Sequence, residues 1–331
     1  PCLTAGDAIA EVARVAWRAD KAYVNPPRYW CFAAFSFDST ARDDIATRMS
    51  AQNPMKSYIL TLSCHDTVGI VAAISGQLAN IGGFIVNSQQ YADLESGRFF
   101  LRIEFTAQGD AFPASLDELR AGFAPIARRY EMRWELRPSS HRPKLLIAVS
   151  KGSHCLNDLL YRWRTGNLPV DVAGVVSNHP DLRDLTEWHG VPYHYLPVRP
   201  DARQEQEAAL LSVFEECDAD YLILARYMQV LSPELVDRLS GRCINIHHSF
   251  LPSFKGARPY ARAHERGVKL IGATAHFVTS DLDEGPIIEQ DVERVDHRAT
   301  EQDLVVMGRD IEARVLARAV RWTAEQKVFL N

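Results

Sequence analysis

The sequence predicts an α/β protein made of two successive parts, and three observations support this class. The chain has 331 residues, of which 47% are hydrophobic and 24% are charged, and this is enough apolar material for two globular cores. Between residues 57 and 137, strand-like and helix-like patterns follow one another in the order βαββαβ. After residue 143, apolar strands alternate with amphipathic helices, as in an open, mostly parallel sheet.

The first part begins with a strand and an amphipathic helix. Residues 58–64 predict the strand, and residues 66–79 place apolar side chains at helical spacing. Asp66, followed by Thr67, is expected to cap this helix at its N-terminus, and Gly82-Gly83 to end it. The remaining elements are predicted as strands at 84–91, 98–105 and 132–136 and a helix at 116–130. This order is that of the ferredoxin-like motif, so residues 57–140 are predicted to form one domain.

A polar segment at 137–143, bracketed by two prolines, marks the boundary to the second part. Buried strands are predicted at 144–149, 170–177, 193–197, 221–224 and 243–246, and helices at 155–164, 181–188, 202–216, 233–239 and 258–266. A pair of strands at 270–278 and 286–295 and a long helix at 300–324 complete the chain. Residues 141–331 are therefore expected to form an open, Rossmann-like, mostly parallel α/β domain.

The first 56 residues carry no comparable pattern beyond a short helical stretch at 8–16, and they are expected to be an N-terminal extension. Met49-Ser50-Ala51 resembles an ordinary translational start. Residues 1–48 are therefore hypothesised to be upstream sequence joined to the functional protein.

Charge and apolar patterning exclude several classes of function. The 37 Lys and Arg residues face 42 Asp and Glu residues, so the net charge of −5 lacks the basic excess needed to bind nucleic-acid backbones. No apolar run reaches the length of about 18 residues that a membrane span requires, and no secretion signal opens the chain. The six cysteines are scattered without a C-x-x-C pair, and we expect them to be reduced thiols in a cytoplasmic protein.

Three loops that follow predicted strands carry residues suited to chemistry, because ligands of open α/β sheets bind beyond the carboxyl ends of strands. The turn at 150–153 opens a helix and is either an anion site or only a tight turn. Strand alternation places Asn245 and His247 on one side, where an amide and an imidazole suit an oxyanion; ordinary capping is the alternative. The acidic turn at 279–286 offers a carboxylate that orients an imidazole and relays protons, or only solvated turn residues.

Motifs for metal, nucleotide or covalent chemistry are absent from the sequence. H-E-x-x-H does not occur, and His247 and His248 are adjacent, so within a strand they are expected to point to opposite faces. Neither a Walker loop nor a G-x-S-x-G elbow is present. The remaining chemistry uses Asn, His and Asp with water as the nucleophile and no metal.

Three segments taken together resemble the folate-dependent formyltransferase family. They are Asn245-Ile246-His247, Leu251 to Gly256, and His276 to Thr279 with Leu282 to Pro286. The resemblance implies that Asn245, His247 and Asp283 are the catalytic residues and that they act on the formyl group of 10-formyltetrahydrofolate.

Within that superfamily, residues 50–331 resemble the formyltetrahydrofolate deformylases, and the resemblance is carried by Asn245 to Pro252, Gly272 to His276, and Ser150-Lys151 with His154 to Leu156. The family implies hydrolysis of 10-formyltetrahydrofolate to formate and tetrahydrofolate, with folate as substrate and no other cofactor. It also implies a role in balancing one-carbon folate pools and in supplying formate for purine biosynthesis. Glycinamide ribonucleotide formyltransferases usually carry proline where His248 stands and lack an ACT domain, and this departure favours a hydrolase. Transfer of the formyl group to an amine is the alternative. A folate or amino-acid sensor without catalysis is a second alternative.

The segment 225–233 resembles the folate-binding loop of the family, in which backbone groups bond the heterocycle and apolar side chains wall it. The residues expected to contact the folate are Leu224, Met228, Gln229, Leu231, Val236, Val278 and Asp281. Gln229 occupies a position used through its backbone. Plain core packing is the alternative for the apolar positions.

The βαββαβ unit resembles an ACT domain, a small-molecule-sensing module. This implies an amino-acid effector, with glycine or methionine as the natural hypothesis, and a homo-oligomer paired through its sheets. Asp66, Gly69 and Asn87 lie where such domains often meet effectors, with capping and turn duty as the alternative.

Overall fold

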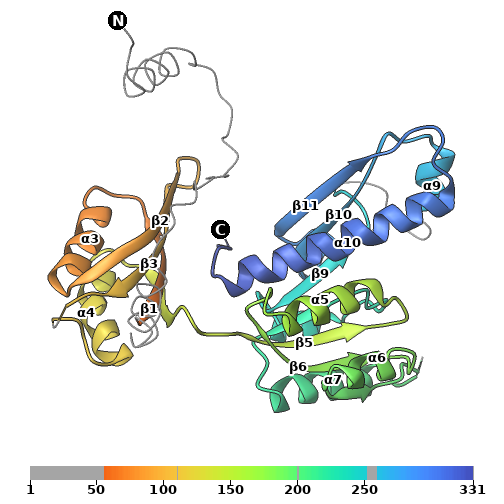
Figure 1. Ribbon diagram of the computed structural model, residues 1–331, viewed down its shortest axis with the longest axis horizontal. Helices are drawn as coiled ribbons and strands as arrows, with labels where there is room; N and C mark the ends of the chain where they lie inside the picture. The colour runs from red at the N-terminus through yellow and green to blue at the C-terminus, as the bar shows by residue number, and fades with distance from the viewer. Residues whose placement is uncertain (1–55, 110, 200, 252–258, 331) are drawn as a thin grey trace, which may run out of the picture. The chain divides into compact units, whose positions relative to one another are not determined.

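The computed structural model describes residues 56–109, 111–199, 201–251 and 259–330 (Figure 1). These residues belong to one compact unit, Met55–Asn331, which contains two separate sheets. Apart from Lys56, the predicted N-terminal extension and its short helix at 8–16 lie outside the described residues. The domain limits at residues 56 and 140 stay predictions.

The first sheet has the predicted ferredoxin-like topology. Its elements are β1 (Ser57–His65), α3 (Ile70–Asn80), β2 (Gly83–Asp93), β3 (Arg98–Ala107), α4 (Leu116–Arg129) and β4 (Arg133–Pro138). The strands pair antiparallel in the order β2-β3-β1-β4. Side chains such as Leu62 and Phe105 from the sheet and Leu78 and Phe123 from the helices are at most 2% exposed, so α3 and α4 pack on one face of the sheet.

The predicted start of the first helix was wrong. The helix α3 begins at Ile70, and Gly69 rather than Asp66 is its N-cap residue, with φ 99° and no side-chain cap. The Asp66 N–H instead donates to the carbonyl of Gly97 and extends the end of the β1–β3 pair. The predicted end is confirmed, since Gly82 adopts φ 71°, and a Cβ there would collide with the carbonyl of Gln108.

The second sheet confirms the open, mostly parallel fold. Its strands are β5 (Lys144–Val149), β6 (Asp171–Ser177), β7 (Tyr193–Tyr195), β8 (Tyr221–Leu224), β9 (Cys243–His247), β10 (Leu270–Phe277) and β11 (Ile287–Arg294). They lie in the order β11-β10-β9-β8-β5-β6-β7. The five strands from β9 to β7 are parallel, and the predicted late pair, β10 and β11, extends the sheet in antiparallel fashion.

Helices cover both faces of this sheet (Figure 1). They are α5 (His154–Arg164), α6 (Arg183–Trp188), α7 (Arg203–Glu216), α8 (Pro233–Arg238), α9 (Pro259–Glu265) and α10 (Glu301–Ala324). Successive residues of β5 face the two hydrophobic cores on opposite sides of the sheet: Ile147 packs with α5 and α10, and Ala148 packs with α7 and α8. Both faces of the strand are therefore apolar, which explains its unbroken hydrophobic sequence.

Two further expectations concern thiols and membranes. The cysteines within the described ranges, Cys64, Cys155, Cys217 and Cys243, are all free, as expected. Burial raises the pKa of each thiol. Among the described helices, none combines the length and the apolar character required to cross a bilayer.

Candidate active site

A cavity of about 200 Å³ lies beyond the carboxyl ends of β8 and β9. It lies outside the carboxyl ends of these two parallel strands, which is where open α/β sheets bind ligands. The loop after β8, the end of β9 and the turn at 279–286 enclose it. Two of the three loops singled out in the sequence, the end of β9 with Asn245 and His247 and the acidic turn at 279–286, therefore meet at this cavity.

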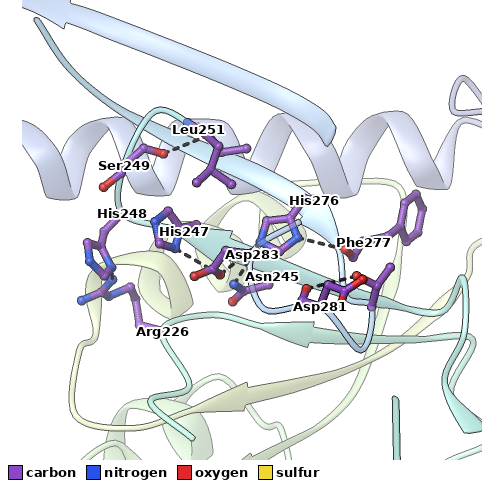
Figure 2. A network of polar contacts seen from close by, with 12 residues as sticks. Arg226, Asn245, His247, His248, Ser249, Leu251, His276, Phe277, Asp281 and Asp283 are labelled. Atoms are coloured by element: carbon purple, nitrogen blue, oxygen red, sulfur yellow. Dashed lines mark hydrogen bonds and ion pairs between the residues drawn. The ribbon is translucent and has the colours of Figure 1, made fainter. Parts of the chain in front are cut away.

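Asn245 and His247 both line this cavity, as strand alternation predicts, and Asp283 reaches it from the acidic turn (Figure 2). The Nδ1 atom of His247 lies 3.2 Å from Oδ1 of Asp283. The hydrogen bond from His247 holds the pKa of the Asp283 carboxyl well below its usual range. Asp283 is therefore ionised and accepts the Nδ1 proton of His247.

The other ring nitrogen of His247, Nε2, is buried and has no hydrogen-bond partner among the described residues. The side chain of His247 is 9% exposed. A buried polar atom without a partner is costly and marks a place where a ligand completes the hydrogen bonding. The imidazole is thus oriented from one side by Asp283, while its second nitrogen is left for chemistry.

His276 was not among the predicted site residues, although it belongs to the segment that carries the resemblance. Its Nδ1 lies 2.9 Å from the main-chain oxygen of Phe277, and its Nε2 lies 3.3 Å from Nδ2 of Asn245. Because the carbonyl of Phe277 can only accept, Nδ1 carries the proton and Nε2 accepts from the amide of Asn245. In the register of β9 and β10, His276 is the direct partner of Asn245. His276 therefore fixes the direction of the Asn245 side chain.

His248 does not point away from His247, contrary to the expectation from strand alternation. The two rings stack with their centroids 4.8 Å apart and an angle of 22° between their planes, and both line the cavity. Strand β9 ends at His247, so the alternation no longer governs the next residue. The neighbours Arg226 and Glu312, which were also not predicted as site residues, hold His248 in place.

The positions predicted to contact folate mostly line the cavity. Those that do so are Leu224, Met228, Gln229, Leu231, Val278 and Asp281. Val236 is 6% exposed and packs in the hydrophobic core with Leu235 and Leu239. Val236 is therefore apolar because it packs in that core, and it is not among the residues that line the cavity.

The small-residue turn at 150–153 braces the loop after β8. The hydroxyl of Ser150 donates to Oδ1 of Asn178 at 2.7 Å and accepts from the backbone N–H of Met228 at 3.0 Å. Both partners are protein groups, so the alternative interpretation as a structural turn has direct support at Ser150.

The three residues predicted for an effector lie on different elements. Asp66 and Gly69 occupy the connection between β1 and α3, whereas Asn87 lies on β2 at an irregularity in its pairing with β3. Asn87 lines a separate cavity with Gln89 and Arg102, and neither Asp66 nor Gly69 lines that cavity.

The chain is similar to known proteins over most of its length. The formyl transferase family model matches residues 143–320. A formyltetrahydrofolate deformylase of Corynebacterium sp. (strain P-1) is 52% identical over 273 residues, 82% of this chain and 95% of that protein. A formyltetrahydrofolate deformylase of Bacillus subtilis (strain 168) is 51% identical, over 82% of this chain and 90% of that protein.

Solved structures show the same relationship. A formyltetrahydrofolate deformylase from Burkholderia mallei ATCC 23344 is 53% identical with a TM-score of 0.79, covering 83% of this chain and 96% of that one. A glycinamide ribonucleotide transformylase 1 from Symbiobacterium toebii is 31% identical with a TM-score of 0.55, covering 60% of this chain and 94% of that one. The likeness to the deformylase thus extends over far more of the chain than the likeness to the transformylase.

Proposed function

The chain belongs to the formyltetrahydrofolate deformylase family, and from this premise we propose that it hydrolyses 10-formyltetrahydrofolate to formate and tetrahydrofolate. The observation that carries the proposal is the cavity in which Asn245, His247 and Asp283 converge. Amide, imidazole and carboxylate together are suited to attack by water on a formyl group.

Asn245 holds the formyl oxygen. One hydrogen of its Nδ2 group is directed to Nε2 of His276, which leaves the second hydrogen free to donate to a substrate in the cavity. As water adds to the formyl carbon, the oxygen becomes an oxyanion, and a donor fixed in advance stabilises it without reorganisation.

His247 stabilises the same oxyanion, and Asp283 aligns both His247 and the attacking water. The ionised carboxylate favours positive charge on the imidazole as negative charge develops on the substrate. The water oxygen bonds to the formyl carbon, the bond from carbon to N10 breaks, and the proton that water loses reaches N10 through this pair. The products are formate and tetrahydrofolate, so the reaction needs no cofactor beyond the folate substrate.

The loop at 225–233 binds the pterin in this proposal. Its backbone groups bond the heterocycle, and Leu224, Leu231 and Val278 form apolar walls around it. Ser150 supports this loop by accepting the N–H of Met228. Binding thus depends on a segment anchored to the sheet rather than on a free loop.

Formate release from 10-formyltetrahydrofolate, measured with purified protein and no amine acceptor, tests the proposal. Steady release is expected, and the variants Asn245→Ala, His247→Ala and Asp283→Ala should each lower its rate by about 10²–10³ while remaining folded. If no formate is released and the formyl group is instead transferred to glycinamide ribonucleotide when that amine is added, the protein is a transferase and the proposal is wrong.

Residues 57–137 are, in the same proposal, an ACT-type regulatory domain that binds an amino acid such as glycine or methionine. The supporting observations are the ferredoxin-like topology and the edge strand β2, where Phe84, Val86 and Tyr91 are each more than half exposed. An apolar edge strand is suited to pairing with a second copy, as expected for a homo-oligomer. Sedimentation velocity with and without each amino acid tests this: a monomer under all conditions would contradict it.

In the cell, we place this activity in the cytoplasm, where it balances one-carbon folate pools and supplies formate for purine biosynthesis. The free thiols are consistent with a reducing compartment. Growth of a deletion strain with and without added formate and purines measures this role.

A further inference from the structure

His248 has no role in the reaction proposed for Asn245, His247 and Asp283. Its ring stacks on that of His247 and lines the same cavity.

The protonation of the His248 ring follows from its partner. Nη1 of Arg226 lies 2.8 Å from Nδ1 of His248, and a guanidinium can only donate. Nδ1 therefore accepts, and the proton of the neutral ring is on Nε2. Burial, the charge of Arg226 and the neighbouring His247 lower the pKa of His248 to about 4, so the ring is neutral at pH 7. His248 thus presents an N–H donor and no positive charge.

That donor has no partner within the described part of the chain. Nε2 of His248 is buried and makes no hydrogen bond there. The same is true of Nε2 of His247, and both residues line the cavity. Two adjacent imidazoles are therefore oriented through their Nδ1 atoms and leave their Nε2 atoms for ligands.

A buried carboxylate fixes the arginine that orients His248. Nε of Arg226 lies 3.3 Å from Oε2 of Glu312, a residue of α10 that is only 1% exposed. Glu312 also accepts from Nε2 of His154 at 2.8 Å and from the hydroxyl of Tyr260 at 2.6 Å. Burial would raise the pKa of Glu312, but the hydrogen bond from His154 and the charge of Arg226 bring it below its ordinary value. The carboxylate is therefore charged and holds Arg226 in place.

The same cluster is not a convincing metal site. His154, Cys155 and Glu312 place potential ligand atoms within 4.8 Å of one another. Both oxygens of Glu312 already accept hydrogen bonds, however. The positively charged guanidinium of Arg226 lies 3.3 Å from Oε2 of Glu312 and would repel a cation bound there. The cluster instead acts as the support of Arg226.

We propose that His248 is a water-positioning residue: its Nε2–H donates to the oxygen of the attacking water and directs the remaining lone pair at the formyl carbon. The inference rests on the proposed function. His248 takes up no proton in this role. The water still loses its proton toward Asp283 and His247, N10 still receives one, and formate and tetrahydrofolate are still the products. Arg226 and Glu312 are positioning residues that act through His248.

The experiment compares two amide substitutions of nearly equal polarity. In His248→Gln the amide nitrogen takes approximately the place of Nε2 and retains a donor, whereas in His248→Asn it takes the place of Nδ1 and does not reach the water. His297→Gln, at an exposed position outside the site, is the control. Thermal unfolding of each variant is measured first, so that a folding defect is recognised.

Two readouts separate positioning from structure. In His248→Asn we expect kcat for formate release to fall about 10²-fold, with KM changed by less than about threefold. The kcat of His248→Gln should be at least about tenfold higher than that of His248→Asn. Hydroxylamine is then supplied as a soluble amine nucleophile that accepts the formyl group as formohydroxamate. The ratio of formohydroxamate to formate should rise at least about tenfold in His248→Asn, because the groups that activate the formyl carbon remain.

Equal kcat values for all variants would overturn the inference. So would an equal loss in His248→Asn and His248→Gln with an unchanged product ratio, since this would reduce His248 to a packing residue. Failure of the proposed function gives a different result, because the unaltered protein itself would then release no formate.

Discussion

Arg226 and Asp283, which reach the reaction cavity from different loops, share a backbone conformation that side chains rarely adopt. Their φ angles are 66° and 59°, both in the left-handed region. This conformation costs about 1–2 kcal/mol for a residue with a Cβ. Each residue carries a charge that holds one of the two stacked imidazoles: Asp283 bonds His247, and Arg226 bonds His248. Local strain at these positions thus accompanies the orientation of the two rings.

Replacing Asp283 by asparagine should separate its chemistry from its backbone role. Asparagine tolerates a left-handed backbone nearly as well as aspartate, so we expect little change in the melting temperature. The charge that supports His247 is lost, and kcat should fall by at least about 10². Steady-state kinetics beside a thermal melt measure both. If the melting temperature also falls strongly, the loss of activity comes mainly from a folding defect.

The low pKa of Asp283 predicts a pH dependence of stability. Because the folded protein binds this proton less readily than the unfolded chain, the contribution is complete above the unfolded pKa of about 4 and is lost as pH falls toward the folded pKa. Between pH 5 and pH 3 the unaltered protein should therefore lose more free energy of unfolding than Asp283→Asn. Urea unfolding at several pH values measures the difference, and parallel curves for both proteins would rule out the shift.

Removing the charge of Glu312 should destabilise the protein, since Arg226 would lose the partner of its buried charge. The variant Glu312→Gln is expected to lower the free energy of unfolding by about 3 kcal/mol, at the lower end for a broken buried pair because Arg226 is 22% exposed. The matched control is Asp310→Asn, an exposed position on the same helix, with an effect within about 0.5 kcal/mol. Similar losses in both variants would argue against a special role for the buried carboxylate.

Two helical glycines should respond to alanine in opposite directions. At Gly76 in α3 an added Cβ would enter open space, so Gly76→Ala should stabilise the protein by about 1 kcal/mol. At Gly308 in α10 the Cβ would collide with the ring of Tyr260, whose hydroxyl bonds Glu312, so Gly308→Ala should destabilise and also lower kcat. Denaturant unfolding and formate release measure the two effects. A stabilised Gly308→Ala protein would show that Tyr260 moves freely.

The predictable part of the site is the part that local periodicity controls. Asn245 and His247 share a face because the period of a strand is fixed, and the apolar runs of β5 and β8 follow from burial on both sides. His248 escaped this reasoning because the strand ends one residue earlier. Apolar character likewise could not distinguish Val236, which packs in the core, from the apolar residues of the cavity wall.

Contacts between distant segments account for the remaining site residues. His154 and Glu312 are 158 residues apart in the chain, and no spacing rule connects them. Only the packing of α10 against α5 brings the carboxylate to the imidazole and to Arg226. The predicted effector positions Asp66 and Gly69 depend on the geometry of the connection between β1 and α3, where Gly69 at φ 99° moves the start of the helix to Ile70.

The residues known to line the reaction cavity all come from Leu224 to Asp283, within the described part of the chain, and the first sheet contributes none of them. If the ferredoxin-like part binds an amino acid, as proposed, that ligand and the folate therefore lie in separate sites. Such an amino acid would act through a coupling free energy between two sites, and because this coupling is reciprocal, bound folate would change the affinity for the amino acid by the same factor.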